Sequence, residues 1–350
     1  MKIFIRAASC ISPQETFNQQ LFFTDIKEYN SGFLKAIEPD YKNILDVKLM
    51  RRMSRIIRTG LTSAIRCLKE AGKENVEAII TGTAYGCMED SEKFLRTIVE
   101  QNEEMLSPTS FIQSTHNTVG AQIALFLKCH NYNNTFVHRG FSFEHALIDA
   151  MLLLNEKKAE NILAGSADEM TDFTFNVLKR FGMYKQMPIS NSDLYESNTK
   201  GSIAGEGTAF FLLTNNQHTD NYAELTGVET IYKPADLQKR IEIFLAAYKT
   251  SIDDIDVVIT GRNGDVRDDD LNTQLETVTF KNNAVIFYKH LCGEYPTASS
   301  FALWLAANIL KQKTLPKCFQ QKQVTKFEKI LICNSYQNKY HSLMLLSACN

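Results

Sequence analysis

The amino-acid sequence predicts an α/β protein in which layers of helix and strand alternate. Apolar runs of strand length alternate along the chain with longer segments whose apolar residues have helical spacing. The order strand, helix, strand, closing strand occurs twice. Alternation of this kind is typical of layered α/β folds, and its repetition predicts two related units packed against each other.

The repeat is clearest in its first strands. Residues 76–82 and 255–261 are both short apolar runs with an acidic residue in second place and a glycine at the end. The elements that follow match in the same order: helices 140–153 and 297–310, strands 161–165 and 329–333, and closing strands 208–213 and 341–346. We therefore divide the chain into related halves, residues 1–216 and 217–350, within one compact unit, and expect a ligand cleft where the two helix starts meet.

Composition excludes several classes of protein. The 38 basic and 40 acidic residues nearly cancel, so nothing favours a nucleic-acid or anionic-membrane partner. No apolar run reaches the roughly 18 residues of a membrane span, and the first residues do not resemble a secretory signal. None of the eight cysteines forms a CxxC pair, which favours buried thiols in a cytoplasmic protein. Glycine is scarce, at 16 of 350 residues against a usual figure of about 7%, so few tight ligand-binding loops are expected.

A basic segment precedes an early amphipathic helix. The helical spacing runs to Gly72, which is placed as a C-cap. Four arginines, Arg51, Arg52, Arg55 and Arg58, gather at the beginning of this helix. They form either a solvated helix face or a docking patch for an acidic partner.

Six motifs in order give a resemblance to a known family. They are Arg51–Arg55, Ser107–Ala124, Ile162–Glu169, Ile203–Ala209, Lys289–Glu294 and Asn334–Tyr336. Together they resemble the β-ketoacyl synthases, and the resemblance implies the thiolase fold. That fold is an αβαβα sandwich of duplicated βαβαβαββ halves.

In the family that these motifs resemble, a helix-start cysteine is acylated and two histidines stabilise the enolate of a decarboxylated malonyl group. Here the nucleophile position falls on Gly140, the first histidine position on Gly261 and the second on Glu294. The final loop, glycine-rich in the family, reads Gln337–Tyr340. All three reactive side chains are therefore absent, whereas the surrounding framework and Lys289 remain.

This pattern resembles the chain length factors, the non-condensing subunits of type II synthases, and most of all the short ketosynthase-like proteins of bacterial aryl-polyene and flexirubin clusters. The resemblance implies a silent subunit that pairs with an active ketosynthase, shapes the acyl tunnel in fatty-acid or polyene biosynthesis, and meets an acyl carrier protein. No resident cofactor and no metal are expected, although contact with the carrier's phosphopantetheine arm is. Two alternatives stay open: an active acyltransferase that uses displaced residues, and a decarboxylase, which the loss of both histidines disfavours.

Several residues are candidates for the tunnel or a pocket: His116, Asn117, His138, Phe141, Phe143, Lys289, His290 and Cys292. The competing interpretation of each is structural. His116 and Asn117 would form a satisfied buried pair beside the expected dimer seam, and His145 would be a core or interface histidine.

Four pairings are weighed in the same way. Arg139 would pair with Glu144 or Asp168, and Glu294 with Lys289 as a buried ion pair. A Cys292–His290 dyad stays open as a source of displaced chemistry. The acidic stretch 265–270 fits a calcium loop poorly, because Arg267 and Asp270 stand where a ligand and a glycine are needed, and is interpreted as a solvated loop.

Overall fold

The computed structural model describes residues 1–17, 25–319 and 324–349. Its main sheet has ten strands in the order β10-β9-β11-β12-β8-β1-β7-β5-β3-β4, and β2 and β6 form a small second sheet. The strands are β1 Phe4–Ile11, β2 Phe33–Leu34, β3 Ala78–Gly82, β4 Tyr132–Phe136, β5 Asn161–Asp168, β6 Ala204–Gly205, β7 Gly207–Thr214, β8 Ala223–Tyr232, β9 Val257–Thr260, β10 Ala284–Phe287, β11 Lys329–Tyr336 and β12 Tyr340–Ser347.

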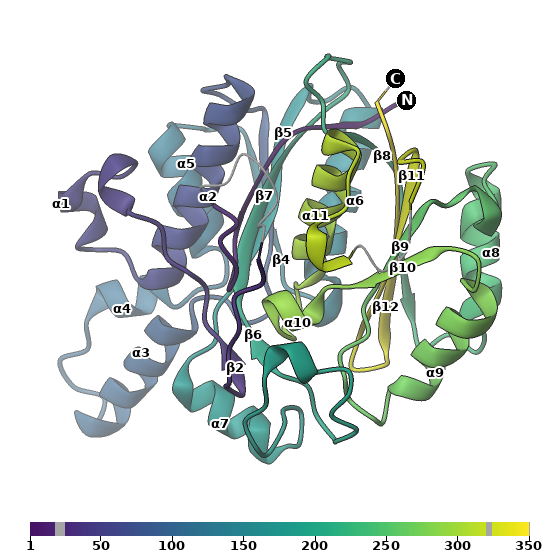
Figure 1. Ribbon diagram of the computed structural model, residues 1–350. Helices are drawn as coiled ribbons and strands as arrows, with labels where there is room; N and C mark the ends of the chain where they lie inside the picture. The colour runs from purple at the N-terminus through teal and green to yellow at the C-terminus, as the bar shows by residue number, and fades with distance from the viewer. Residues whose placement is uncertain (18–24, 320–323, 350) are drawn as a thin grey trace.

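The main sheet consists of two five-stranded halves that mirror each other in strand order. Reading outward from the middle, β1, β7, β5, β3 and β4 correspond to β8, β12, β11, β9 and β10. Only two residue pairs, Phe4 with Glu224 and Ile5 with Ala223, join β1 to β8. The halves can therefore turn away from each other and enclose helices between them (Figure 1).

Helices fill the space between and outside the two halves. In Figure 1, α6 and α11 lie between the halves, α2 and α5 cover one outer face, and α8 and α9 cover the other. The helices are α1 Val47–Met50, α2 Arg55–Ala71, α3 Met88–Glu100, α4 Pro108–Gln113, α5 Thr118–Leu127, α6 Ser142–Asn155, α7 Asp172–Arg180, α8 Leu237–Ala247, α9 Asp269–Gln274, α10 Lys289–Cys292 and α11 Ser299–Gln312. Short helical turns are η1 Tyr41–Asn43, η2 Arg139–Phe141, η3 Asn191–Asp193, η4 Ile252–Asp254, η5 Leu275–Thr279 and η6 Lys317–Phe319. This is the five-layer α/β arrangement that the sequence predicted.

The four repeated pairs all exist: β3 with β9, α6 with α11, β5 with β11, and β7 with β12. The strands extend beyond the predicted bounds; β5 continues to Asp168 and β11 to Tyr336. The predicted boundary at residues 216 and 217 falls in the connection between β7 and β8. No helix among the described residues is long and apolar enough to cross a membrane.

Helix α2 shows how local sequence sets an element. Its C-cap Gly72 has φ +64°, and its backbone N–H donates to the carbonyls of Leu68 and Lys69, as the sequence predicted. One face, which includes Leu61 and Ile65, is buried against β1 and β7. The helix is therefore held by apolar burial along its length and by a left-handed glycine at its end.

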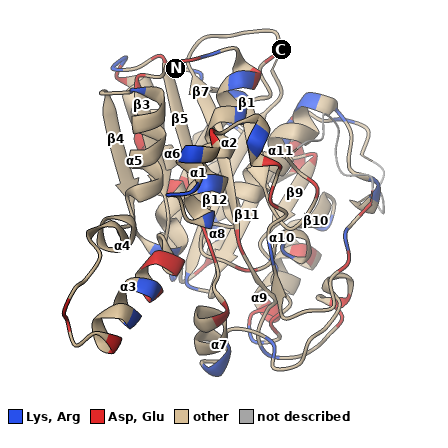
Figure 2. Ribbon diagram, turned by 90° about the vertical axis from the view of Figure 1, so that its left-hand side faces the viewer, with Lys and Arg blue, Asp and Glu red and all other residues tan. Residues whose placement is uncertain are grey.

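Strand β4 lies at one edge of the main sheet, with α5 packed beside it (Figure 2). Neither element contains a charged residue. On this side of the molecule, Leu125 and Phe126 of α5 are 72% and 38% exposed. The edge is thus an uncharged, partly apolar surface with one unpaired strand side.

Candidate functional site

Gly140 lies in η2, immediately before α6, and it is buried. A Cβ built on it would be 2.8 Å from Cδ1 of Tyr336 and 2.9 Å from Cβ of Tyr340. Contacts this short overlap the van der Waals radii of carbon atoms. The position that resembles the family's nucleophile has therefore lost its side chain and also the space for one.

Aromatic rings from the last two strands fill the region over Gly140. Tyr340 packs edge-on against Phe141 with ring centres 5.0 Å apart, and Tyr336 lies 6.2 Å from Tyr340. The hydroxyls of Tyr336 and Tyr85 are 3.5 Å apart. The expectation of an open ligand cleft at this helix start is wrong directly over Gly140, because these tyrosines occupy it.

Gly261 follows β9 and is packed just as tightly. A Cβ there would lie 2.4 Å from the backbone nitrogen of Ser335 and 2.7 Å from Oδ1 of Asn334. The first of these contacts is to backbone, which cannot swing away as a side chain can. An imidazole at this position would require β11 to move.

Glu294 and Lys289 form the buried ion pair that the sequence predicted. Lys289 Nζ donates to Glu294 Oε2 at 2.6 Å and to the Ser335 carbonyl at 2.5 Å, and both side chains are buried. Burial raises the pKa of Glu294, and the nearby Lys289 charge opposes that rise. The position resembling the second catalytic histidine therefore holds a structural ion pair.

The proposed pairing of Arg139 with Glu144 or Asp168 is wrong. Arg139 is exposed, whereas Glu144 is buried and accepts a hydrogen bond from Ser342 at 2.7 Å. Burial raises the pKa of Glu144. The buried carboxyl group is paired with a hydroxyl that is buried beside it. Burying the Arg139 guanidinium as well would cost free energy that its exposure to water avoids.

Asp168 is a junction that sequence reasoning missed. Its Oδ1 accepts from the Thr83 hydroxyl and the backbone N–H of Ala84 and Tyr85, and its Oδ2 accepts from Thr297. Thr297 belongs to the second half, so one carboxylate ties the loop after β3 to the segment just before α11. The only sequence signal was an acidic residue at the end of an otherwise apolar strand.

The Cys292–His290 dyad does not form. The Cys292 thiol is buried and donates to the Gly293 carbonyl at 3.3 Å, and burial raises its pKa well above the usual value. The Nδ1 atom of His290 faces the Tyr195 hydroxyl at 3.3 Å, and burial lowers the pKa of His290 to about 4. A neutral thiol without a base beside it is a poor nucleophile.

The remaining tunnel candidates are divided between surface and core. His116, Asn117 and His138 are exposed in the single chain, so a buried His116–Asn117 pair does not form within it. Phe141 belongs to the aromatic group over Gly140. Phe143, two residues later, lies fully buried in the main core against Phe211.

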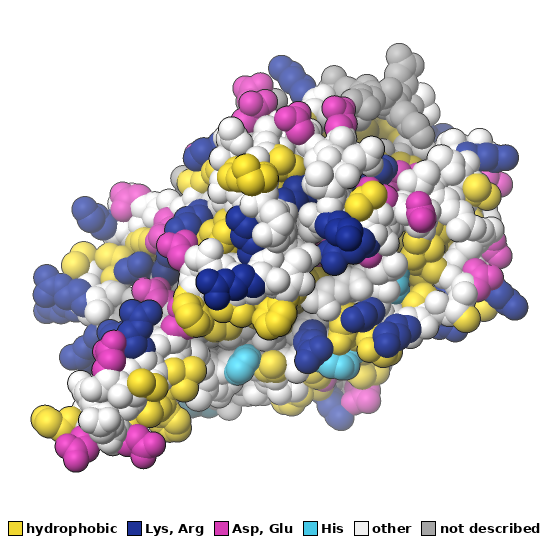
Figure 3. Space-filling view, turned by 90° about the horizontal axis from the view of Figure 1, so that it is seen from below, with side chains coloured by type: hydrophobic (Ala, Val, Ile, Leu, Met, Phe, Trp, Pro, Cys, Tyr) yellow, Lys and Arg dark blue, Asp and Glu magenta, His cyan; other side chains and the backbone are white. Residues whose placement is uncertain are grey.

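The four arginines of the basic segment have different roles. Arg51 and Arg52 are exposed in the turn between α1 and α2, and Arg58 lies 3.9 Å from Glu38. Arg55 instead forms a bidentate ion pair with the buried Glu206, so its charge is not free for docking. Figure 3 shows basic side chains gathered at the left, the side on which Figure 1 shows α1.

The stretch 265–270 is only in part the solvated loop that we expected, since Val266, Arg267 and Asp270 are exposed. Asp265 is buried, and it accepts from the backbone N–H and the guanidinium of Arg267. Arg267 also donates to the Gly182 carbonyl at 2.7 Å. Arg267, which stands where a calcium loop needs a ligand, therefore stabilises this turn itself.

Comparisons with known proteins agree with this architecture. The sequence family model of the β-ketoacyl synthase N-terminal domain matches residues 34–220, which is more than half of the 350 residues. None of the curated proteins matches the chain.

Three solved structures have the same fold over nearly their whole length. The ishigamide ketosynthase/chain length factor has a TM-score of 0.81 at 15% identity, covering 100% of this chain and 99% of that chain. The ketosynthase ApeO in complex with its chain length factor ApeC, from Xenorhabdus doucetiae, has 0.78 at 14%, covering 99% and 98%. The AntDE:AntF complex, a type II PKS acyl-carrier protein with its ketosynthase bound to the hexaketide, has 0.76 at 15%, covering 99% of both chains. The chain therefore belongs to the β-ketoacyl synthase family, in the thiolase fold.

Proposed function

We propose that this chain is a catalytically silent β-ketoacyl synthase-like subunit of the chain-length-factor type. In this proposal it pairs with an active ketosynthase and shapes the acyl tunnel in type II fatty-acid or polyene biosynthesis. The observation that carries the proposal is the packing at Gly140 and Gly261, where tyrosines and backbone occupy the space of a nucleophile and a histidine. A scaffold kept whole around a filled site suits a partner subunit better than an enzyme acting alone.

Similar structures support the choice of partner. Two of them are described as a ketosynthase with a chain length factor, and a third contains an acyl-carrier protein with its ketosynthase. By analogy, we assign this chain an active ketosynthase as its stable partner and an acyl carrier protein as a transient partner. The carrier's phosphopantetheine arm would then enter the partner's site, and Arg51 and Arg52 are the exposed cations available to an acidic carrier.

The uncharged edge at β4 is the surface that we assign to the ketosynthase. A free strand edge offers backbone N–H and C=O groups to a second chain. Around it lie exposed apolar side chains: Leu125, Phe126, Tyr132, Val137 and Leu152. Burying them against a partner of similar character gains roughly 25 cal/mol for each Å² of apolar surface.

The tunnel role rests on position. The exposed His138 and the aromatic Phe141 follow β4 directly, so both lie next to the surface assigned to the partner. Groups at this point can limit the length of a chain that grows from the partner's active site. His116 and Asn117, exposed just before α5, flank the same surface.

The alternative, an active acyltransferase with displaced residues, has less support. Its best candidates, Cys292 and His290, do not face each other, and the pKa values of both move away from a thiolate–imidazolium pair. Decarboxylation alone would need oxyanion donors where Gly261 and the Lys289–Glu294 pair now stand.

One experiment separates the two functions. The chain is co-expressed with a candidate ketosynthase of the same organism, and both are treated with an acyl-thioester donor before peptide mass spectrometry. We expect a one-to-one heterodimer that carries the acyl label only on the ketosynthase. A labelled Cys292, or a homodimer that condenses acyl groups by itself, contradicts the proposal.

A further inference from the structure

His138 and His145 form a close pair at the start of α6. Their Nδ1 atoms are 3.2 Å apart, and their ring centres are 4.9 Å apart. His138 is exposed and His145 is half-buried. The pair therefore lies at the surface, with one imidazole fixed by the helix and the other by the turn before it.

The two distances limit how the rings can point. In a straight hydrogen bond between the two nitrogens, the ring centres would lie about 5.5 Å apart, since each centre lies behind its nitrogen. The observed centres are closer, so the contact is bent at one or both rings.

A tetrahedral metal ion bound by both nitrogens also requires a bent arrangement. With Zn–N bonds of about 2.0–2.1 Å, two ligand nitrogens lie about 3.3 Å apart and their ring centres about 5.2 Å apart. The distances in the pair are close to these values.

Aromatic side chains hold the geometry. The His145 ring packs against Phe136 and Phe141, and the His138 ring packs edge-on against Phe141. Such packing restricts both imidazoles to few orientations, so little freedom is lost on binding. In the described part of the chain, no group of three or more candidate ligands gathers, so two coordination positions would be left to water.

We propose that His138 and His145 bind one divalent transition metal ion, of the class that prefers imidazole, such as Zn²⁺. The ion would fasten the turn before α6 to the helix. That turn contains Arg139 at φ +51°, a backbone conformation that non-glycine residues adopt at a cost. The sequence predicted no metal site, because a spacing of seven residues across a turn and a helix matches no standard motif. This inference does not rest on the proposed function.

For the test, the isolated full chain is first treated with a chelator to remove bound metal. It is then titrated with Zn²⁺, followed by calorimetry, and separately with Co²⁺, followed by visible absorption. We expect one ion per chain and a rise in Tm at saturating Zn²⁺. His138→Ala and His145→Ala should each raise the dissociation constant for Zn²⁺ at least about tenfold. Even residues that only hydrogen-bond to metal ligands contribute that much to affinity.

The matched control is His130→Ala, an exposed histidine before β4, which should leave the titration unchanged. Tm without metal shows whether each variant is folded. Absence of Zn²⁺ binding in the unaltered chain, or binding that survives His138→Ala or disappears in His130→Ala, overturns the proposal.

Discussion

At the residue scale, Gly140 is the position where packing bears most directly on the proposed silence. A glycine in place of a nucleophile could leave a pocket, but here Tyr336 and Tyr340 fill the space over it. At Glu294, the ion pair with Lys289 is buried on both sides. Breaking such a pair by removing one partner costs about 3–5 kcal/mol, because the remaining charge is left buried and unpaired.

Gly140→Cys is therefore expected to lower the free energy of unfolding by about 1–3 kcal/mol, the usual cost of overpacking, and to restore no acylation. Urea unfolding and acyl trapping measure the two effects. Combined with Tyr336→Ala, which removes the overlapping ring, the same substitution should cost clearly less than the sum of the two single changes. Additive costs would show that Tyr336 does not close the site.

At the element scale, the start of α6 separates two neighbouring phenylalanines by environment. Phe141 faces the tyrosines over Gly140, and Phe143 faces Phe211 in the core. In the heterodimer, Phe141→Ala should lengthen the product of the paired enzyme, measured by mass spectrometry. Phe143→Ala, the matched control, should instead lower stability by about 3–5 kcal/mol without changing product length. If the heterodimers with the two variants make products of equal length, Phe141 does not line the tunnel.

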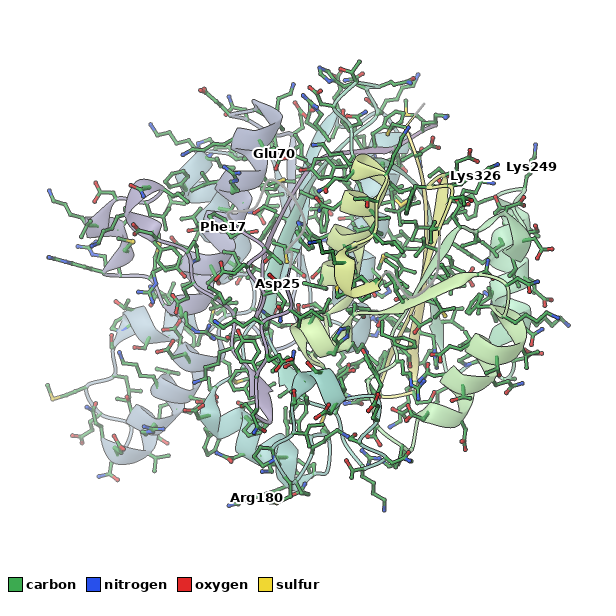
Figure 4. All side chains as sticks on the ribbon, in the orientation of Figure 1. Phe17, Asp25, Glu70, Arg180, Lys249 and Lys326 are labelled. Atoms are coloured by element: carbon green, nitrogen blue, oxygen red, sulfur yellow. The ribbon has the colours of Figure 1, made fainter. Side chains whose placement is uncertain are left out.

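The turn between α1 and α2 is the second element with an expected partner. Reversing Arg51 and Arg52 to Glu should weaken carrier binding, with a smaller effect at high salt, because exposed charges are screened within about 10 Å at 0.1 M. Lys249→Glu is the control: Figure 4 shows Lys249 on the side opposite α1. Fluorescence anisotropy with labelled carrier protein measures the affinity of both variants. An equal loss of affinity in the control would show that net charge, and not this site, causes the effect.

Arg55 lies in the same segment but belongs to the fold. Its removal would leave the buried Glu206 carboxylate without its cation. A loss of carrier binding in an Arg55 variant would therefore report unfolding, and such a variant cannot test docking.

At the scale of the whole molecule, α5 and α8, which lie on the outer faces of the two halves, differ in character. The β4 edge is uncharged and flanked by exposed apolar residues of α5, whereas α8, on the outer face of the other half, carries both charges. Leu125→Asp with Phe126→Asp should abolish or strongly weaken the heterodimer by burying charge in the interface. Ile243→Asp, at a 48% exposed position on α8, should leave it intact. Analytical ultracentrifugation decides, and an intact dimer in the first variant would place the interface elsewhere.

Sequence reasoning succeeded where the signal was local or repeated. Gly72 was recognised as a C-cap because the left-handed conformation favours glycine, and the Lys289–Glu294 pair because five residues separate its members. It failed for Arg139 and for Asp265, because exposure and burial there depend on segments far away in the chain. Arg55 was missed as a structural residue for the same reason, since its partner is Glu206.

By itself, the sequence predicted the layered, duplicated α/β fold, and its resemblance to the β-ketoacyl synthases implied that the three reactive positions fall on Gly140, Gly261 and Glu294. The repeat carries the first prediction and the ordered motifs carry the second, and neither requires knowledge of distant contacts. Only the tertiary structure decided whether Gly140 and Gly261 are open or filled, because Tyr336 and Asn334 reach them from β11, a strand far away in the sequence. It alone also brought His138 and His145 together, since a turn and a helix must first set the directions of the two rings.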